Sequence, residues 1–331
     1  MLQTTSYKWI AFAVLVMVMQ IAATSPGFNL EFQDDHFLVE GIFQTQALES
    51  ADAPEFIVSG KNYTGRDMYL YLLTVGPDFK PAIQWQSENL FEERSTLGVT
   101  VGKFTAPERQ ILAISQTNFY LYQFTKEKPF LAIQGRHKLD ALNIASADLN
   151  GDGRDELITA VVGQVTNTSY QCRVRVWKFE NNQFALIAQS GLMGNIRSLT
   201  AGDLDGDGSV EIVVEEGLRA ASGNLHILSL TNNNQFVEEY NLKKATQSAA
   251  YGIKIRSFPE GIRLIAATAN GKINFFKWSN RQLVPTGAEL SFSSGLVDAD
   301  ALDLNGDLLP ELLIICYPQR FLILRNLGGI N

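Results

Sequence analysis

Three short acidic segments recur along the chain in the same form and constrain its fold more than any other feature. Each alternates Asp or Asn with other residues, ends in Glu and leads directly into a short apolar run. The segments are residues 148–156, 203–211 and 303–311. They begin about 55 and about 100 residues apart, so the second interval has room for one further copy. This spacing predicts an array of similar units rather than two unrelated domains.

Three weaker copies complete the series. Residues 254–266 and 99–114 keep the paired apolar runs without the acidic residues, and residues 39–43 lead to a similar run at 54–58. Alternating apolar runs with polar turns follow the copies and predict antiparallel hairpins. Each period of about 50 residues then holds four short strands, which is the size of one β-propeller blade.

The last unit lacks its fourth strand. Residues 321–326 are followed only by Leu-Gly-Gly-Ile-Asn, whereas residues 28–32 near the start form a short alternating apolar run. Pairing of these two segments would close the ring and remove an exposed sheet edge. The sequence therefore predicts an all-β fold: one six-bladed β-propeller over residues 24–331, closed by an N-terminal strand. Seven blades is the alternative.

Residues 1–23 have the layout of a targeting segment. Lys8 precedes an unbroken apolar run that ends in small residues, as in a secretory signal peptide. An uncleaved membrane anchor is the alternative, although the run is shorter than the roughly 20 residues that a spanning helix needs. Either interpretation places the bulk of the chain outside the cytoplasm, secreted or associated with the cell envelope. Membrane contact is expected only through this segment, if it stays uncleaved.

Charge and cysteine content exclude further classes of protein. The formal net charge is −8, with 27 Lys plus Arg against 35 Asp plus Glu, so the chain lacks the basic surface that nucleic-acid binding requires. The 2 cysteines, Cys172 and Cys316, lie far apart and build neither a disulfide scaffold nor a cysteine zinc site. We expect both to be free, buried thiols in different blades.

The acidic segments place oxygen-bearing side chains at positions 1, 3, 5 and 9. Alternate residues of a tight turn can direct their oxygens to one centre, and calcium takes about six to eight oxygen ligands. Glycine at position 4, and at position 6 of the first two segments, permits such a turn. Position 7 would add its backbone carbonyl. The predicted calcium ligands are Asp148, Asn150, Asp152, Arg154 and Glu156; Asp203, Asp205, Asp207, Ser209 and Glu211; and Asp303, Asn305, Asp307, Leu309 and Glu311.

Two other interpretations of these segments are weaker. Asp, Asn and Gly are common turn formers, but a turn alone does not require oxygens at the same four offsets in three places. An EF-hand needs Glu at position 12, where this chain has Thr159, Val214 and Ile314. The third segment departs from the pattern, with Leu308 in place of glycine and Pro310 before the last ligand. Up to three structural calcium ions are therefore predicted.

The acidic segments resemble the calcium loops of FG-GAP and VCBS repeats, which form the blades of integrin α-subunit propellers and of many secreted bacterial proteins. The resemblance is specific at three loops and extends by strand pattern over about 300 residues. It implies calcium in the loop between the first two strands of a blade, mainly as a structural clamp. Residues 103–111 and 257–265 depart from the motif, with Lys103 and Ser257 at the first-ligand position. We expect no metal in those two blades.

The sequence contains no catalytic motif of the kinds Gly-x-Ser-x-Gly, P-loop or His-Glu-x-x-His. The expected function is therefore non-enzymatic: an exported, calcium-stabilised binding, adhesion or scaffold module for a protein or glycan. The alternative is an extracytoplasmic hydrolase or polysaccharide lyase with a site in the central funnel. Its candidate residues are Arg197, Lys254, Asp298 and Asp300. A solvent-facing or structural placement is the simpler expectation for the two aspartates.

Overall fold

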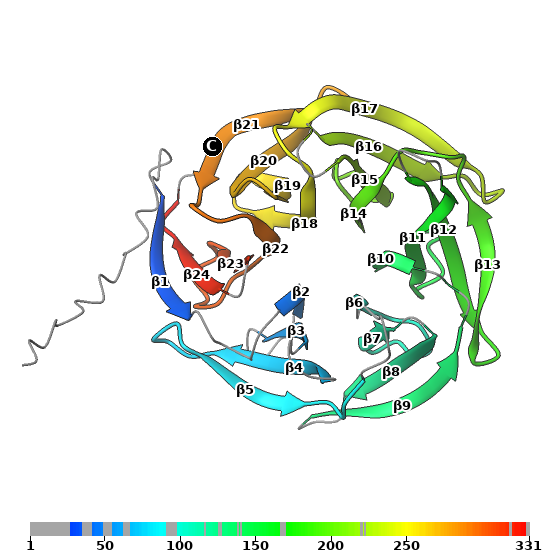
Figure 1. The fold of residues 1–331 in the computed structure, drawn as a ribbon, viewed down its shortest axis with the longest axis horizontal. Coiled ribbons are helices and arrows are strands. Elements are labelled where there is room, and N and C mark those ends of the chain that lie inside the picture. Colours follow the sequence, from blue (N-terminus) through cyan, green and yellow to red (C-terminus); the bar gives the residue numbers. More distant parts are fainter. Residues whose placement is uncertain are drawn as a thin grey trace, which may run out of the picture.

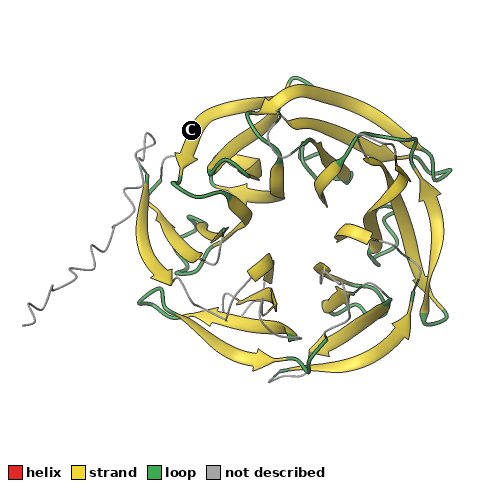
Figure 2. Cartoon of the chain, in the orientation of Figure 1, coloured by secondary structure: helices red, strands yellow, loops and turns green. Residues whose placement is uncertain are grey.

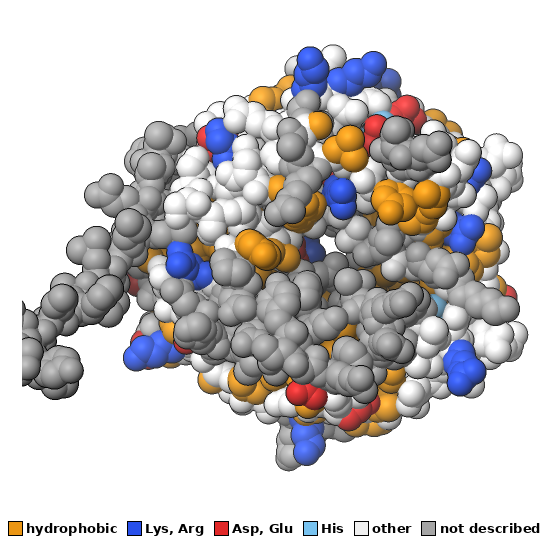
Figure 3. Space-filling view, viewed as in Figure 1, with side chains coloured by type: hydrophobic (Ala, Val, Ile, Leu, Met, Phe, Trp, Pro, Cys, Tyr) orange, Lys and Arg blue, Asp and Glu red, His pale blue; other side chains and the backbone are white. Residues whose placement is uncertain are grey.

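The computed structural model describes residues 27–34, 42–48, 55–61, 67–90, 98–115, 117–124, 128–137, 139, 141–165, 170–218, 221, 223–317 and 320–328. Within these residues the regular elements are all strands, and they form six four-stranded antiparallel sheets. The sheets stand as blades around a central axis (Figures 1 and 2), and the space-filling view shows a narrow opening at the centre (Figure 3). The predicted six-bladed β-propeller is confirmed.

Blades 1 to 5 each take four consecutive strands, which run in order from the axis to the rim (Figure 1). Blade 1 contains β2 (Ile42–Leu48), β3 (Glu55–Lys61), β4 (Met68–Val75) and β5 (Pro81–Gln86). Blade 2 contains β6 (Gly98–Gly102), β7 (Gln110–Ile114), β8 (Asn118–Phe124) and β9 (Pro129–Arg136). Blade 3 contains β10 (Ala141–Ala147), β11 (Glu156–Val165), β12 (Tyr170–Glu180) and β13 (Gln183–Gln189). Blade 4 contains β14 (Ile196–Gly202), β15 (Glu211–Glu216), β16 (Gly223–Leu230) and β17 (Phe236–Thr246). Blade 5 contains β18 (Ala250–Phe258), β19 (Gly261–Thr268), β20 (Lys272–Ser279) and β21 (Gln282–Ser291).

Blade 6 joins the two ends of the described chain. Its strands, from the axis outward, are β22 (Leu296–Leu302), β23 (Glu311–Cys316), β24 (Arg320–Asn326) and β1 (Phe28–Asp34). The blue strand β1 lies beside the red strand β24 in Figure 1 and pairs with it antiparallel, with Phe28 opposite Asn326. The predicted closure by an N-terminal strand is confirmed, and the ring closes with six blades rather than seven.

Hydrophobic packing between neighbouring blades holds the ring together. The middle strands are apolar on both faces, as in β7 and β23, because each blade is covered on both sides by its neighbours. The described buried residues divide into six clusters, and each cluster draws its members from two adjacent blades. One example is the contact of Phe56 in blade 1 with Phe321 in blade 6, whose ring centroids lie 5.9 Å apart. The core is therefore a series of blade interfaces.

Several further sequence predictions can be compared with the strands. The weak copies 99–114 and 254–266 correspond to the first two strands of blades 2 and 5. Cys172 lies in β12 and Cys316 in β23; both are buried and neither forms a disulfide with a described residue, as expected. No helix among the described residues is long and apolar enough to cross a membrane. The targeting segment 1–23 lies outside the described residues, so it stays a prediction.

Candidate metal sites

The three acidic segments occupy equivalent places in three blades. Each joins the innermost strand of its blade to the second strand: β10 to β11, β14 to β15 and β22 to β23. Because the strands alternate in direction, these three loops emerge at the same end of the ring. The resemblance implied that the acidic loops lie between the first two strands of a blade, and the structure places all three there.

The first aspartate of each loop organises the backbone of the turn. In loop 203–211, Asp203 Oδ1 accepts a hydrogen bond from Gly206 N at 2.7 Å and Oδ2 accepts one from Gly208 N at 3.0 Å. The same two bonds reach Asp148 from Gly151 N at 2.7 Å and Gly153 N at 2.8 Å, and Asp303 from Gly306 N at 2.8 Å and Leu308 N at 2.9 Å. The three loops therefore share one backbone conformation, including the loop whose sequence departs from the pattern.

That conformation requires positive φ at position 6. Gly153 and Gly208 adopt φ of 83° and 89°, which glycine accepts without strain, but Leu308 holds φ of 68° at the equivalent point. The side chain of Leu308 is 77% exposed, so packing does not offset the cost of this conformation. The hydrogen bonds from Gly306 N and Leu308 N to Asp303 hold Leu308 in this conformation.

Substitution of Leu308 by glycine is therefore expected to stabilise the protein by about 0.5–1 kcal/mol, since the left-handed backbone would lose its steric cost. Chemical denaturation of the two proteins measures the change. Leu309→Gly, one residue further along and without positive φ, serves as the control and is expected to destabilise. A loss of stability in Leu308→Gly would show that the leucine side chain stabilises the fold despite its exposure.

The glutamate at position 9 is buried beneath each loop. Glu156, Glu211 and Glu311 are 1%, 5% and 0% exposed, and the Oε2 of each accepts the backbone N–H of the leucine at position 2, at 3.0, 2.8 and 2.8 Å. Burial, aided by the neighbouring aspartates, raises the pKa of each glutamate to about 7. Each loop thus gathers carboxylates around one desolvated glutamate.

The donor atoms suit a hard cation. In loop 203–211, carboxylate oxygens of Asp203, Asp205 and Glu211 lie within 4.8 Å of one another. In the other two loops an asparagine takes position 3, and its Nδ2 donates to the position 9 glutamate, at 2.7 Å in loop 148–156 and 3.2 Å in loop 303–311. All these side chains are oxygen donors of the kind that calcium prefers. The residues present fit the ion.

Positions 5 and 7 are tied together in the same way in every loop. The backbone N–H of Arg154, Ser209 and Leu309 donates to Oδ1 of Asp152, Asp207 and Asp307, at 3.0, 2.7 and 2.9 Å. The structure therefore brings all fifteen predicted ligands into three matching turns. Their role as ligands, including the carbonyls of position 7, stays a prediction.

A comparison with known protein families detects the segment that contains two of these loops. The model of the FG-GAP-like repeat matches residues 148–214. These residues are similar to an FG-GAP-like repeat. The match begins at Asp148, the first residue of loop 148–156, and ends inside β15, so it includes two of the three acidic loops. No curated protein matched the chain.

Blade 2 closes the equivalent turn without the acidic residues. Gln110 begins β7 at the place where Glu156 begins β11, and it is 0% exposed. Its Oε1 accepts N–H groups from Phe104 at 3.1 Å and Thr105 at 2.8 Å. A neutral amide thus makes the bond that a glutamate makes in the acidic loops, and no cation is needed. Sequence reasoning missed Gln110 because the loop of blade 2 is one residue shorter than the acidic loops, which shifts the alignment. Its position at the start of the second strand could have identified it.

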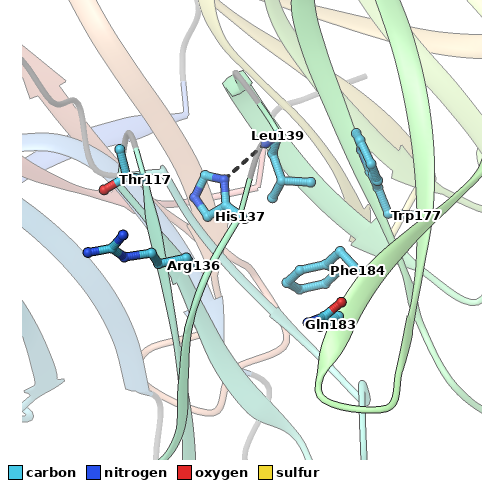
Figure 4. A pocket seen from close by; sticks show the side chains of 7 residues that line it. All are labelled: Thr117, Arg136, His137, Leu139, Trp177, Gln183 and Phe184. Atoms are coloured by element: carbon cyan, nitrogen blue, oxygen red, sulfur yellow. Dashed lines mark hydrogen bonds between the residues drawn. The ribbon is translucent and has the colours of Figure 1, made fainter.

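A pocket of about 650 Å³ lies between blades 2 and 3, apart from the acidic loops (Figure 4). Its walls are formed by Thr117, Arg136, His137, Leu139, Trp177, Gln183 and Phe184. The imidazole of His137 is fully engaged by the fold, because Nδ1 accepts from Leu139 N at 3.0 Å and Nε2 faces two backbone carbonyls. The Trp177 indole donates to Thr159 at 2.9 Å. The wall therefore presents no available general acid or base at His137.

The candidate funnel residues lie on the inner strands, but the structure pairs the charged ones across blades 5 and 6. Asp300 is 0% exposed and accepts two hydrogen bonds from Arg256, at 2.7 and 2.9 Å. Asp298 is 3.6 Å from Lys254 Nζ. Arg197 in blade 4 stacks over Tyr251 with its guanidinium carbon 5.8 Å from the ring centroid. The expected structural role fits Asp300 best. Sequence reasoning missed Arg256, whose partner is set by strand alignment between blades.

Proposed function

We propose that this protein is an exported, calcium-stabilised β-propeller that serves as a binding or scaffold module for a protein or glycan. One observation carries the proposal: three loops with the same backbone, each with a buried glutamate, recur at one end of a closed ring. Calcium bound there would neutralise the clustered carboxylates. The Asp, Asn and Glu side chains of each loop would hold the ion and so tie the first two strands of the blade together. Such a role is structural and leaves the other end of the ring for a partner.

The opposite end of the ring has the features of a contact surface. Exposed apolar side chains project there from blades 3 and 4, namely Val165, Tyr170, Leu192 and Leu218. The space-filling view shows hydrophobic side chains gathered over these blades on the face that it draws (Figure 3). Two hollows of about 400 and 310 Å³ lie among them and share Glu216 in their walls. Exposed apolar groups around a polar hollow are typical of interaction sites.

The proposed binding role is tested by capture. The immobilised chain, kept in calcium, is presented with a glycan array and with cell-surface extracts. Leu218→Asp is expected to abolish retention of the captured ligand, since it places a charge in the contact surface. Ile83→Asp, an exposed change on the outermost strand of blade 1, is expected to leave retention unchanged. Equal retention by both variants would place the ligand elsewhere on the molecule, and no retention of any ligand would contradict a binding role.

The alternative function, a hydrolase or lyase with a site in the funnel, requires acidic groups that are free to react. The charge pairing across blades 5 and 6 argues against Asp300 in this role, because Arg256 binds both of its carboxylate oxygens. We therefore favour a structural role for this pair and a non-enzymatic function for the chain.

The substitution Asp300→Ala is expected to cost about 3 kcal/mol of stability, because it leaves the Arg256 guanidinium without its buried partner. Urea denaturation measures the change. The double variant Arg256→Met with Asp300→Leu removes both charges and is expected to recover most of the loss. A variant Asp300→Ala that keeps its stability but loses a hydrolytic or lyase activity of the wild-type chain would favour the enzymatic alternative.

A further inference from the structure

The strand register identifies one equivalent position beside each acidic loop. In blade 3, Leu157 pairs with Trp177, so Lys178 is the next residue toward the loop. In blade 4, Ile212 pairs with Leu228, which makes Ser229 the equivalent residue. In blade 6, Leu312 pairs with Leu324, and the equivalent residue is Arg325. The third strand of each blade therefore places lysine, serine or arginine next to the loop.

Lys178 is bonded directly to a predicted ligand. Its Nζ lies 2.7 Å from Asp152 Oδ2, the side chain at position 5 of loop 148–156. Both side chains are partly exposed, at 39% and 37%. A cation bound in this loop would therefore have an ammonium group as its neighbour, and the two positive charges would repel each other.

Arg325 has a weaker version of the same contact. Its guanidinium is 3.8 Å from Asp307 Oδ2 in loop 303–311. The group also stacks over the Phe79 ring of blade 1, with the guanidinium carbon 5.7 Å from the ring centroid. Its positive charge thus lies near the loop but further from the ligand than the Lys178 ammonium does.

Loop 203–211 has no such cation at the equivalent position, because Ser229 is neutral. It also carries Asp205 where the other two loops carry asparagine, so it offers four carboxylates against three. Calcium sites are tuned by the number of charged ligands and by the surrounding charge. The neutral Ser229 and the additional carboxylate of Asp205 therefore both favour tighter calcium binding in loop 203–211.

We propose that the residue at this register position sets a graded series of calcium affinities: loop 203–211 binds calcium most tightly, loop 303–311 less tightly, and loop 148–156 most weakly because Lys178 acts as a built-in competing cation. This inference rests on the proposed calcium sites and adds an order to them. The protein would keep one ion at low calcium and fill the other two loops only as calcium rises. By Coulomb's law in water, a unit positive charge beside a bound divalent ion weakens the binding of that ion by about tenfold.

The test is a calorimetric titration of the calcium-free full-length chain with calcium chloride. Lys178→Gln is expected to tighten the weakest binding step about tenfold, because the competing charge is lost. Ser229→Lys is the reciprocal change and is expected to weaken the tightest step by a similar factor. Asp205→Asn should also weaken the tightest step, toward the values of the other two loops.

Lys277→Gln is the matched control. Lys277 follows Phe276, which pairs with Leu264, so it occupies the same register position in blade 5, where no acidic loop is present. It is expected to change no binding step. Calcium binding whose steps are unaltered by Lys178→Gln and Ser229→Lys would overturn the proposed order while leaving the calcium sites intact. Absence of any calcium binding to the wild-type chain would overturn the proposed calcium sites, and the order with them.

Discussion

Replacement of Phe28 by alanine is expected to lower the free energy of unfolding by about 4 kcal/mol, an effect typical of truncating a buried aromatic residue. Phe28 is 8% exposed, and its ring stacks on Phe275 of blade 5 with centroids 6.4 Å apart. It lies on β1, the strand that joins the N-terminal part of the chain to β24. The substitution therefore weakens both a blade interface and the closure of the ring.

Chemical denaturation of the full chain measures this effect, and size-exclusion chromatography reports any association through a released sheet edge. Asn29→Ala is the control: it changes the next residue of β1, which is exposed, and is expected to alter stability by less than about 0.5 kcal/mol. Equal and small effects of the two substitutions would show that β1 contributes little to closure.

The blade pattern could be predicted from the sequence because its signals are local. Alternating apolar residues mark a strand within a few positions, and the Asp and Gly residues of an acidic loop mark its turn. Even the closure by residues 28–32 could be predicted, since the final unit lacked a strand that only the start of the chain could supply. The structure extends this strand to Phe28–Asp34.

Features that depend on alignment between strands could not be predicted. The salt bridge between Arg256 and Asp300 joins two blades, and it depends on how β18 packs beside β22 in the neighbouring sheet. The equivalence of Lys178 and Ser229 likewise depends on strand pairing within each blade. Leu308 departs from the sequence pattern of the other two loops, and only the structure shows that the surrounding hydrogen bonds hold it in the backbone conformation that glycine adopts there.

Removal of calcium is expected to have the largest effect of all, because three loops would lose their ions together. Each loop that binds only in the folded state contributes about 2.7 kcal/mol when calcium is present at about one hundred times its dissociation constant. Without the ion, the carboxylates around Glu156, Glu211 and Glu311 repel one another beside a desolvated group. The loops of blades 2 and 5 are expected to contribute nothing to this change.

Asp205→Ala separates the contribution of one loop from that of the ring. It removes a ligand from loop 203–211, where three carboxylates lie within 4.8 Å of one another. The variant is expected to lose stability mainly when calcium is present, since the wild type has no ion to lose in chelator. A similar loss in calcium and in chelator would assign Asp205 to turn formation instead of metal binding.

The most direct test of the calcium-stabilised propeller is thermal melting of the full chain in calcium and in chelator, together with the calcium bound per chain at saturation. The account predicts a melting temperature that rises with calcium concentration and a stoichiometry that approaches three, one ion for each acidic loop. An unchanged melting temperature and no bound calcium would contradict it.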